Sequence, residues 1–172
     1  MTSTPDFGLG PDTDFDTGID PDRDLMIERI IRAPRQAVWS AWTDPAQLVQ
    51  WWIPSPLVLR VDALDLRPGG AFVTRMSEDG QTFTSHVDAV FLRIEEDSRL
   101  VFTNAVDSSW HPAQPAPVTM TTEIILGDSE FGTDYRAIVR HASPEQRALH
   151  EELGFFEGWG TVTEALARLV ER

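Results

Sequence analysis

The sequence predicts an α+β protein in which a curved antiparallel sheet of about six or seven strands wraps around one long C-terminal helix. Residues 143–172 repeat apolar side chains at steps of three or four, as an amphipathic helix does. Most of the preceding chain alternates apolar and polar residues in short runs separated by turn-forming residues, which is typical of strands. At 172 residues, the chain is long enough for one domain with a substantial core.

The predicted helix begins at a capping signal. Ser143 suits the N-cap, Pro144 suits the first helical position, and Gln146 stands three residues after the cap. One face carries the apolar or small residues Leu149, Leu153, Phe156, Gly160, Thr163, Leu166 and Val170. That face has to be covered, and a sheet wrapped around the helix buries both partners at once.

Three glycines, Gly154, Gly158 and Gly160, interrupt the predicted helix. Each of them weakens a helix by roughly 1 kcal/mol relative to alanine. We interpret them as positions that allow close backbone approach or leave room for a ligand beside Phe155, Phe156 and Trp159.

Residues 1–24 are rich in Asp, Gly, Pro and Thr, and predict an acidic tail that is disordered or loosely held. Asp12, Asp14 and Asp16 resemble the start of a calcium loop, but the glycine and the closing glutamate of such a loop are missing. A solvated tail is therefore favoured over a calcium site. A single domain is predicted to follow over residues 25–172.

Most elements of that domain are predicted to be strands. A first strand is predicted over 25–31, followed by two short helices over 35–43 and 46–52 that Asp44-Pro45 separates. Further strands are predicted over 57–66, 71–76, 81–94, 99–105, 118–126 and 134–141. Residues 108–117 form a long loop that contains three prolines.

The composition excludes several classes of function. Asp and Glu total 28 against 14 basic residues, and the net charge of -14 argues against nucleic acid or an anionic membrane as a partner. Every basic residue is arginine, so lysine Schiff-base chemistry and a Walker-type phosphate loop are excluded. The absence of cysteine excludes thiol nucleophiles and disulfides. With no apolar leader and no long apolar run, we expect a soluble cytoplasmic protein without membrane insertion.

The histidines do not have the spacing of metal ligands. There is no HExxH motif, and His150-Glu151-Glu152 offers a single imidazole. We therefore expect neither a metal site nor a cofactor.

Several short motifs of the sequence occur in the same order as in a known family. They are Ile31-Arg32-Ala33-Pro34 before Val38-Trp39, Trp42-Thr43-Asp44-Pro45, Leu48, Trp51-Trp52, Pro68-Gly69-Gly70-Ala71-Phe72, Ile94 with Arg99-Leu100-Val101-Phe102, and Gly158-Trp159. From about Leu25 to the C-terminus the chain resembles the SRPBCC superfamily, and more narrowly the homologues of the C-terminal domain of the heat-shock-protein-90 ATPase activator. The resemblance implies a START-like, helix-grip fold with a cavity between the sheet and the C-terminal helix.

Aromatic residues are the first candidates for contact with a ligand in such a cavity. Trp51 and Trp52 end the second short helix near the expected mouth, so that one lines the pocket while the other packs on the sheet, although a structural role is the commoner outcome for each. Trp159 lies beside the helix glycines and is expected to line the pocket. The other candidate ligand contacts are Phe72, Met76, Trp110, Tyr135 and Phe155.

A polar pair is the second candidate. His86 and Asp88 are two residues apart on one predicted strand, so we expect their side chains to share a face. On the concave face they would orient a ligand or act as acid and base, whereas on the convex face they would be solvated. Apolar Val90 on the same parity favours the concave face, and Phe91 on the other parity argues against it.

Three functions remain open at this point. The favoured one is a binding protein for an apolar small molecule, aromatic or lipid-like. The second is an enzyme resembling polyketide cyclases and aromatases, with His86 and Asp88 moving protons. The third, implied by the resemblance, is a module that interacts with a chaperone, and a homodimer is a further partnership that the sequence permits.

Overall fold

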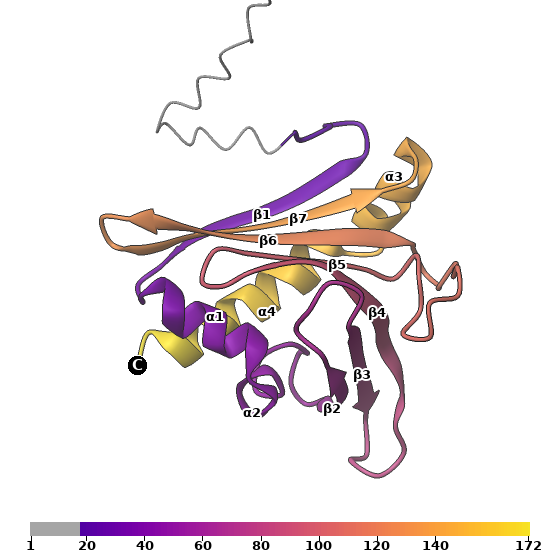
Figure 1. Ribbon diagram of the computed structural model, residues 1–172, viewed down its shortest axis with the longest axis horizontal. Coiled ribbons are helices and arrows are strands. Elements are labelled where there is room, and N and C mark those ends of the chain that lie inside the picture. Colours follow the sequence, from indigo (N-terminus) through magenta and orange to yellow (C-terminus); the bar gives the residue numbers. More distant parts are fainter. Residues whose placement is uncertain (1–17) are drawn as a thin grey trace, which may run out of the picture.

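The computed structural model describes residues 18–172, and the predicted tail with its candidate calcium aspartates lies largely outside that range. Within it, the elements in chain order are β1 (Asp24–Ile31), α1 (Arg35–Thr43), α2 (Pro45–Leu48), β2 (Val58–Leu64), β3 (Ala71–Ser77), β4 (Thr84–Glu95), β5 (Arg99–Thr103), β6 (Met120–Ser129), β7 (Gly132–His141), α3 (Pro144–Glu152) and α4 (Phe155–Val170). This order confirms the predicted α+β class, with two short helices after the first strand (Figure 1).

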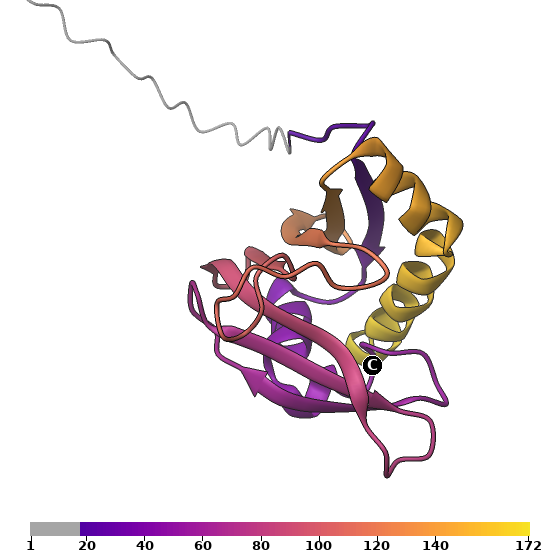
Figure 2. The same ribbon diagram turned by 90° about the vertical axis from the view of Figure 1, so that its right-hand side faces the viewer.

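The strands form a single seven-stranded antiparallel sheet in the order β1-β7-β6-β5-β4-β3-β2. Each of β2 to β6 pairs with the next strand along the chain, and β1 adds to the far edge beside β7. The pairing register shifts by one residue at Asp62, His86 and Leu92. Such bulges bend strands, and here they lie in the β2–β4 part, so that the sheet curves around the helices (Figure 2).

The second short helix ends earlier than predicted. Asp44 caps α2 by accepting a hydrogen bond from the Ala46 amide, and Pro45 occupies the first turn, as the sequence indicates. The helix stops at Leu48, however, so Trp51 and Trp52 lie in the turn that follows it. Their side chains turn into the core rather than extending a helical face.

The predicted C-terminal helix is divided in two, which corrects the expectation of one continuous helix. Gly154 adopts a left-handed conformation with φ of 95° between α3 and α4, and glycine tolerates this conformation best. The break changes the buried face: α3 buries no residue, and Leu149, Leu153 and Phe156 are exposed. Together α3 and α4 form an arc across the open side of the sheet (Figure 2).

The other helix glycines do not allow close backbone approach. A Cβ atom built on Gly158 or on Gly160 would meet nothing within 4 Å. Close backbone approach is therefore wrong for both glycines, and Gly158 has open space on its side of the helix.

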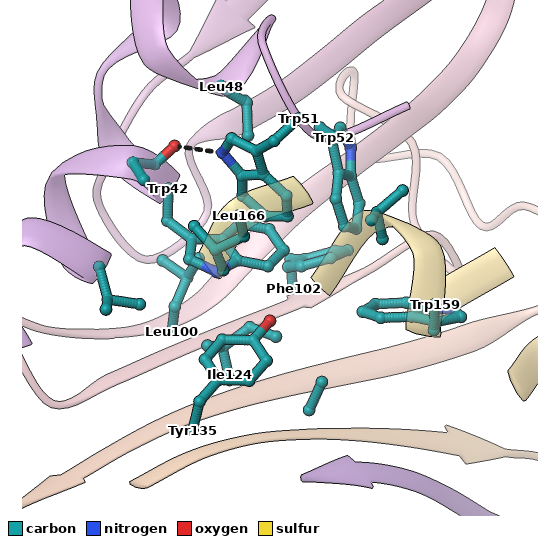
Figure 3. Packing of buried hydrophobic residues seen from close by; sticks show 14 of the residues in the cluster. Trp42, Leu48, Trp51, Trp52, Leu100, Phe102, Ile124, Tyr135, Trp159 and Leu166 are labelled. Atoms are coloured by element: carbon teal, nitrogen blue, oxygen red, sulfur yellow. Dashed lines mark hydrogen bonds between the residues drawn. The ribbon is translucent and has the colours of Figure 1, made fainter. Parts of the chain in front are cut away.

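An aromatic cluster fills the space between the sheet and α4. The Trp42 ring lies 4.7 Å from both the Trp51 and the Trp52 rings, and Phe102 packs against Trp42 and Trp52 (Figure 3). Trp51 is fixed by a 3.0 Å hydrogen bond from its Nε1 to the Ala41 carbonyl oxygen. The concave side of the sheet is therefore largely filled by side chains around Trp42.

Candidate functional site

An open pocket of about 340 Å³ lies where the α3–α4 break faces β4 and the start of β6. Its lining residues are Trp52, Pro54, His86, Val87, Pro117, Met120, His150, Leu153, Gly154, Phe155, Gly158, Trp159 and Val162. Among these residues there is no Asp, Glu or Arg, although the whole chain carries a net charge of -14. The pocket is therefore an uncharged surface of apolar side chains with two imidazoles.

Trp52 connects the core to this pocket. Its ring lies 4.7 Å from Trp42 on the core side and 5.4 Å from Trp159 on the helix side, in an edge-to-face arrangement with Trp159. The Phe155 ring lies 5.8 Å from Trp159, and all three pocket aromatics are nearly fully buried. The predicted pocket residues Trp52, Phe155 and Trp159 are thus brought together in one place.

A bulge in β4 places His86 at the pocket. Thr74 of β3 pairs with Val87, and Arg75 pairs with Ser85, so His86 is the extra residue on β4. Both His86 and Val87 consequently line the pocket, which strict alternation along a strand would not permit. The buried Thr74 hydroxyl forms a 2.9 Å hydrogen bond with His86 Nδ1.

The predicted pairing of His86 with Asp88 is wrong. Asp88 is exposed, and its carboxylate accepts a 2.7 Å hydrogen bond from the Ser108 amide in the loop before β6. The bulge places the two side chains on different sides of the sheet. Asp88 therefore fixes a loop, and no proton exchange with His86 is available to it.

A pair of histidines that the sequence reasoning missed reaches the same pocket. His141 ends β7, and its Nε2 lies 2.8 Å from Nδ1 of His150 on α3. His141 Nδ1 in turn lies 2.8 Å from the backbone oxygen of Arg23, just before β1. The only sequence signal is the short connection between a strand end and the Ser143 N-cap, which brings the two residues onto adjacent elements.

Burial dominates the electrostatics of the pocket imidazoles. It lowers the pKa of His86 to about 4, because the charged ring would lose its water. Burial, together with the neighbouring His141, also lowers the pKa of His150 to about 4. The pKa of His141 is lowered by burial as well, against an opposing effect from the Arg23 carbonyl and Asp24. All three rings are neutral at pH 7.

We expect acidification from pH 7 to pH 5 to lower the free energy of unfolding through these rings. The His86 pKa is about 4 in the folded protein against 6.5 in the unfolded chain, so the unfolded state binds the proton first as pH falls below 6.5. The His86 contribution to the loss is about 2 kcal/mol at pH 5. Urea denaturation at both pH values measures it.

His86→Gln should reduce this pH-dependent loss, because glutamine does not titrate but can keep a hydrogen bond to Thr74. His111→Gln is the matched control, since the His111 side chain is 77% exposed and should leave the loss unchanged. An undiminished loss in His86→Gln would contradict the assignment.

The remaining predicted ligand contacts lie elsewhere. Trp51, Phe72 and Tyr135 are within the core, where Phe72 stacks on Phe91 with ring centroids 5.3 Å apart. Tyr135 is fully buried, and burial raises the pKa of its hydroxyl (Figure 3). Met76 lines a separate surface hollow beside the turn between β3 and β4.

Trp110 does not cap the pocket. Its side chain is exposed and lies over Gly69, with Nε1 donating a 2.8 Å hydrogen bond to the Gly69 oxygen. The tryptophan therefore anchors the long loop to the turn before β3.

Two further properties concern the described chain, residues 18–172. It contains no group of three or more side chains placed to hold a metal ion. No helix in the same range has the length and apolar character needed to cross a membrane.

A curved antiparallel sheet that grips a C-terminal helix, with two short helices after the first strand, defines the helix-grip class of the SRPBCC superfamily. Within it, the chain belongs to the family described as Activator of Hsp90 ATPase homolog 1-like protein, whose model matches residues 32–171. The resemblance seen in the sequence is thereby confirmed.

Solved structures agree with this assignment. A protein from Nitrosomonas europaea is 38% identical, with a TM-score of 0.78, over 89% of this chain and 97% of the other. A protein from Arthrobacter aurescens has a TM-score of 0.72 at 23% identity, over 87% and 86% of the two chains. An AHSA1-like protein from Aeromonas hydrophila has a TM-score of 0.64 at 23% identity, over 86% and 92%. The last two show the fold alone, and no curated protein matches the chain.

Proposed function

We propose that this protein binds an apolar small molecule, aromatic or lipid-like, in the pocket between the α3–α4 break and β4. The observation that carries the proposal is the uncharged lining, in which Trp52, Phe155 and Trp159 form an aromatic wall beside Val87 and Met120. Burial of apolar ligand surface against such a wall supplies the driving force for binding. A volume of about 340 Å³ lies at the small end of the range for ligand sites, which favours a compact ligand.

The other two functions have less support. A cyclase-like enzyme would have to use His86 without Asp88, because Asp88 contacts the Ser108 loop instead. Interaction with a chaperone rests on the description of the family and stays a prediction. Ligand binding is favoured because the pocket itself supports it.

Filling the pocket from the helix side should abolish binding. Gly158 lines the pocket and has open space where a side chain would project, so Gly158→Leu should place its side chain in the ligand volume. We expect the affinity for a neutral aromatic probe, para-pentylanisole, to fall at least about tenfold, as when the apolar contact of a whole side chain is displaced. Amide NMR titration or native mass spectrometry measures this.

Gly160→Leu provides the matched control. Gly160 is on the same helix, has the same open surroundings and is not among the pocket-lining residues. Gly160→Leu should leave the affinity for para-pentylanisole unchanged. Failure of the unaltered protein to bind the probe, or equal effects of the two substitutions, would reject the proposed site.

A further inference from the structure

The histidine pair forms a chain of hydrogen bonds that starts at a backbone carbonyl and ends at the pocket. The Arg23 oxygen lies 2.8 Å from His141 Nδ1, and His141 Nε2 lies 2.8 Å from His150 Nδ1. His150 lines the pocket and its ring meets Phe155 edge to face, with centroids 5.1 Å apart. Because Nδ1 of His150 is used by His141, the nitrogen left for the pocket is Nε2.

The carbonyl at one end determines where each proton lies. A carbonyl oxygen only accepts, so His141 Nδ1 has to donate to Arg23. In a neutral ring the other nitrogen then carries no proton, so His141 Nε2 accepts from His150 Nδ1. By the same rule, His150 Nε2 is left as an unprotonated acceptor. It makes no hydrogen bond to any residue of the described chain, 18–172.

We propose that the pocket selects neutral apolar ligands that carry a hydroxyl group, such as phenols or alcohols, through a hydrogen bond from the ligand O–H to Nε2 of His150. This inference rests on the proposed binding function and specifies the class of ligand. The apolar part of the ligand lies against the aromatic wall of Trp52, Phe155 and Trp159.

The same arrangement rejects charged ligands. A carboxylate only accepts hydrogen bonds and would face another acceptor at His150, and no arginine lines the pocket to compensate it. The net charge of -14 adds long-range repulsion of anions. A cation would find no carboxylate in the lining. The site therefore favours neutral ligands that donate a hydrogen bond.

His86 differs from His150 in this respect. Its Nδ1 partner is the Thr74 hydroxyl, which can either donate or accept, so the His86 ring can take either tautomer. The preference for a donor therefore comes from His150, and His141 acts as its positioning residue.

Three probes of similar size distinguish a preference for a ligand hydroxyl group from the binding of apolar ligands in general. For the unaltered protein at pH 7.5, we expect para-pentylphenol to bind about five- to tenfold more tightly than para-pentylanisole, the worth of one neutral hydrogen bond. Para-pentylbenzoate should bind most weakly of the three. Equal binding of phenol and anisole would overturn the selectivity while leaving the apolar pocket intact, whereas absence of binding by both would remove the pocket itself.

Two variants test the residues. His150→Phe keeps an aromatic ring but no acceptor, so the ratio of the affinities for the phenol and the anisole should fall to about one. His111→Phe, on an exposed loop, should keep the preference. A preference for the phenol that survives in His150→Phe would assign it to another residue and overturn the proposal.

The tautomer itself is observable without relying on a variant that folds. Imidazole nitrogen NMR of histidine-labelled protein should show the proton of both His141 and His150 on Nδ1. In His141→Phe, His150 should lose this preference, and the selectivity for the phenol should fall with it. A His150 proton on Nε2 in the unaltered protein would overturn the proposal.

Discussion

Replacement of Trp42 by alanine is expected to lower the free energy of unfolding by about 4 kcal/mol. Trp42 is 1% exposed on α1, and its ring contacts both Trp51 and Trp52 at centroid distances of 4.7 Å (Figure 3). Removing the indole leaves a large cavity at the centre of the aromatic cluster, where the surrounding rings can relax only in part. Urea denaturation followed by far-UV circular dichroism measures the change.

The consequence of Trp42→Ala should extend to the pocket. Trp52 packs on Trp42 from one side and on Trp159 from the other, so loosening of the core should also weaken binding of an aromatic probe. The control is Trp110→Ala, which removes a side chain that is 66% exposed and one hydrogen bond to Gly69. It should cost only about 1 kcal/mol. Similar losses in the two variants would contradict the central role of the cluster.

Gly132→Ala is expected to have an effect of comparable size, with a loss of about 3 kcal/mol or more. Gly132 begins β7 with φ of 141°, and a Cβ atom there would lie 2.2 Å from the Ile31 oxygen and 2.8 Å from the Ala33 nitrogen. Both are backbone atoms, one in the last residue of β1 and one just beyond it, so no side-chain rotation relieves the clash. The β1–β7 edge would have to separate there, which denaturation experiments and amide exchange of β1 would detect.

The control for this prediction separates steric overlap from backbone conformation. Gly80 also has a positive φ, of 73°, but a Cβ atom there would meet nothing within 4 Å. Gly80→Ala should therefore cost only the left-handed conformation, about 1 to 2 kcal/mol. Equal losses at the two positions would show that contact with β1 contributes nothing.

Local signals in the sequence predicted most of the elements. α1 spans Arg35–Thr43 as the apolar spacing indicated, and the Ser143 cap with Pro144 marks the start of α3. These features depend on residues within a turn or two of one another, so the sequence alone carries them. The arrangement of the sheet around the C-terminal helix also followed from these patterns, and the family resemblance agreed with it.

The sequence contains a signal for the break between α3 and α4, although it predicted one continuous helix. Gly154 directly follows Leu153, as a glycine after a helix C-terminus often does. The regular spacing of apolar residues across it favoured one continuous helix. The difference matters because the pocket is lined from both sides of the break, by His150 on α3 and Phe155 on α4.

By itself, the sequence determined the class of fold and the order of its elements. It also determined that Trp52, Phe155 and Trp159 supply uncharged aromatic side chains, and that lysine and cysteine chemistry is absent. Only the tertiary structure decided that His86 faces the pocket without Asp88, and that His141 lies within hydrogen-bond distance of His150. Strand alternation is a local property, but a bulge is defined by register against a neighbouring strand, and a hydrogen bond between β7 and α3 by how these elements pack. The chemistry of the site therefore follows from contacts between segments that no single stretch of sequence contains.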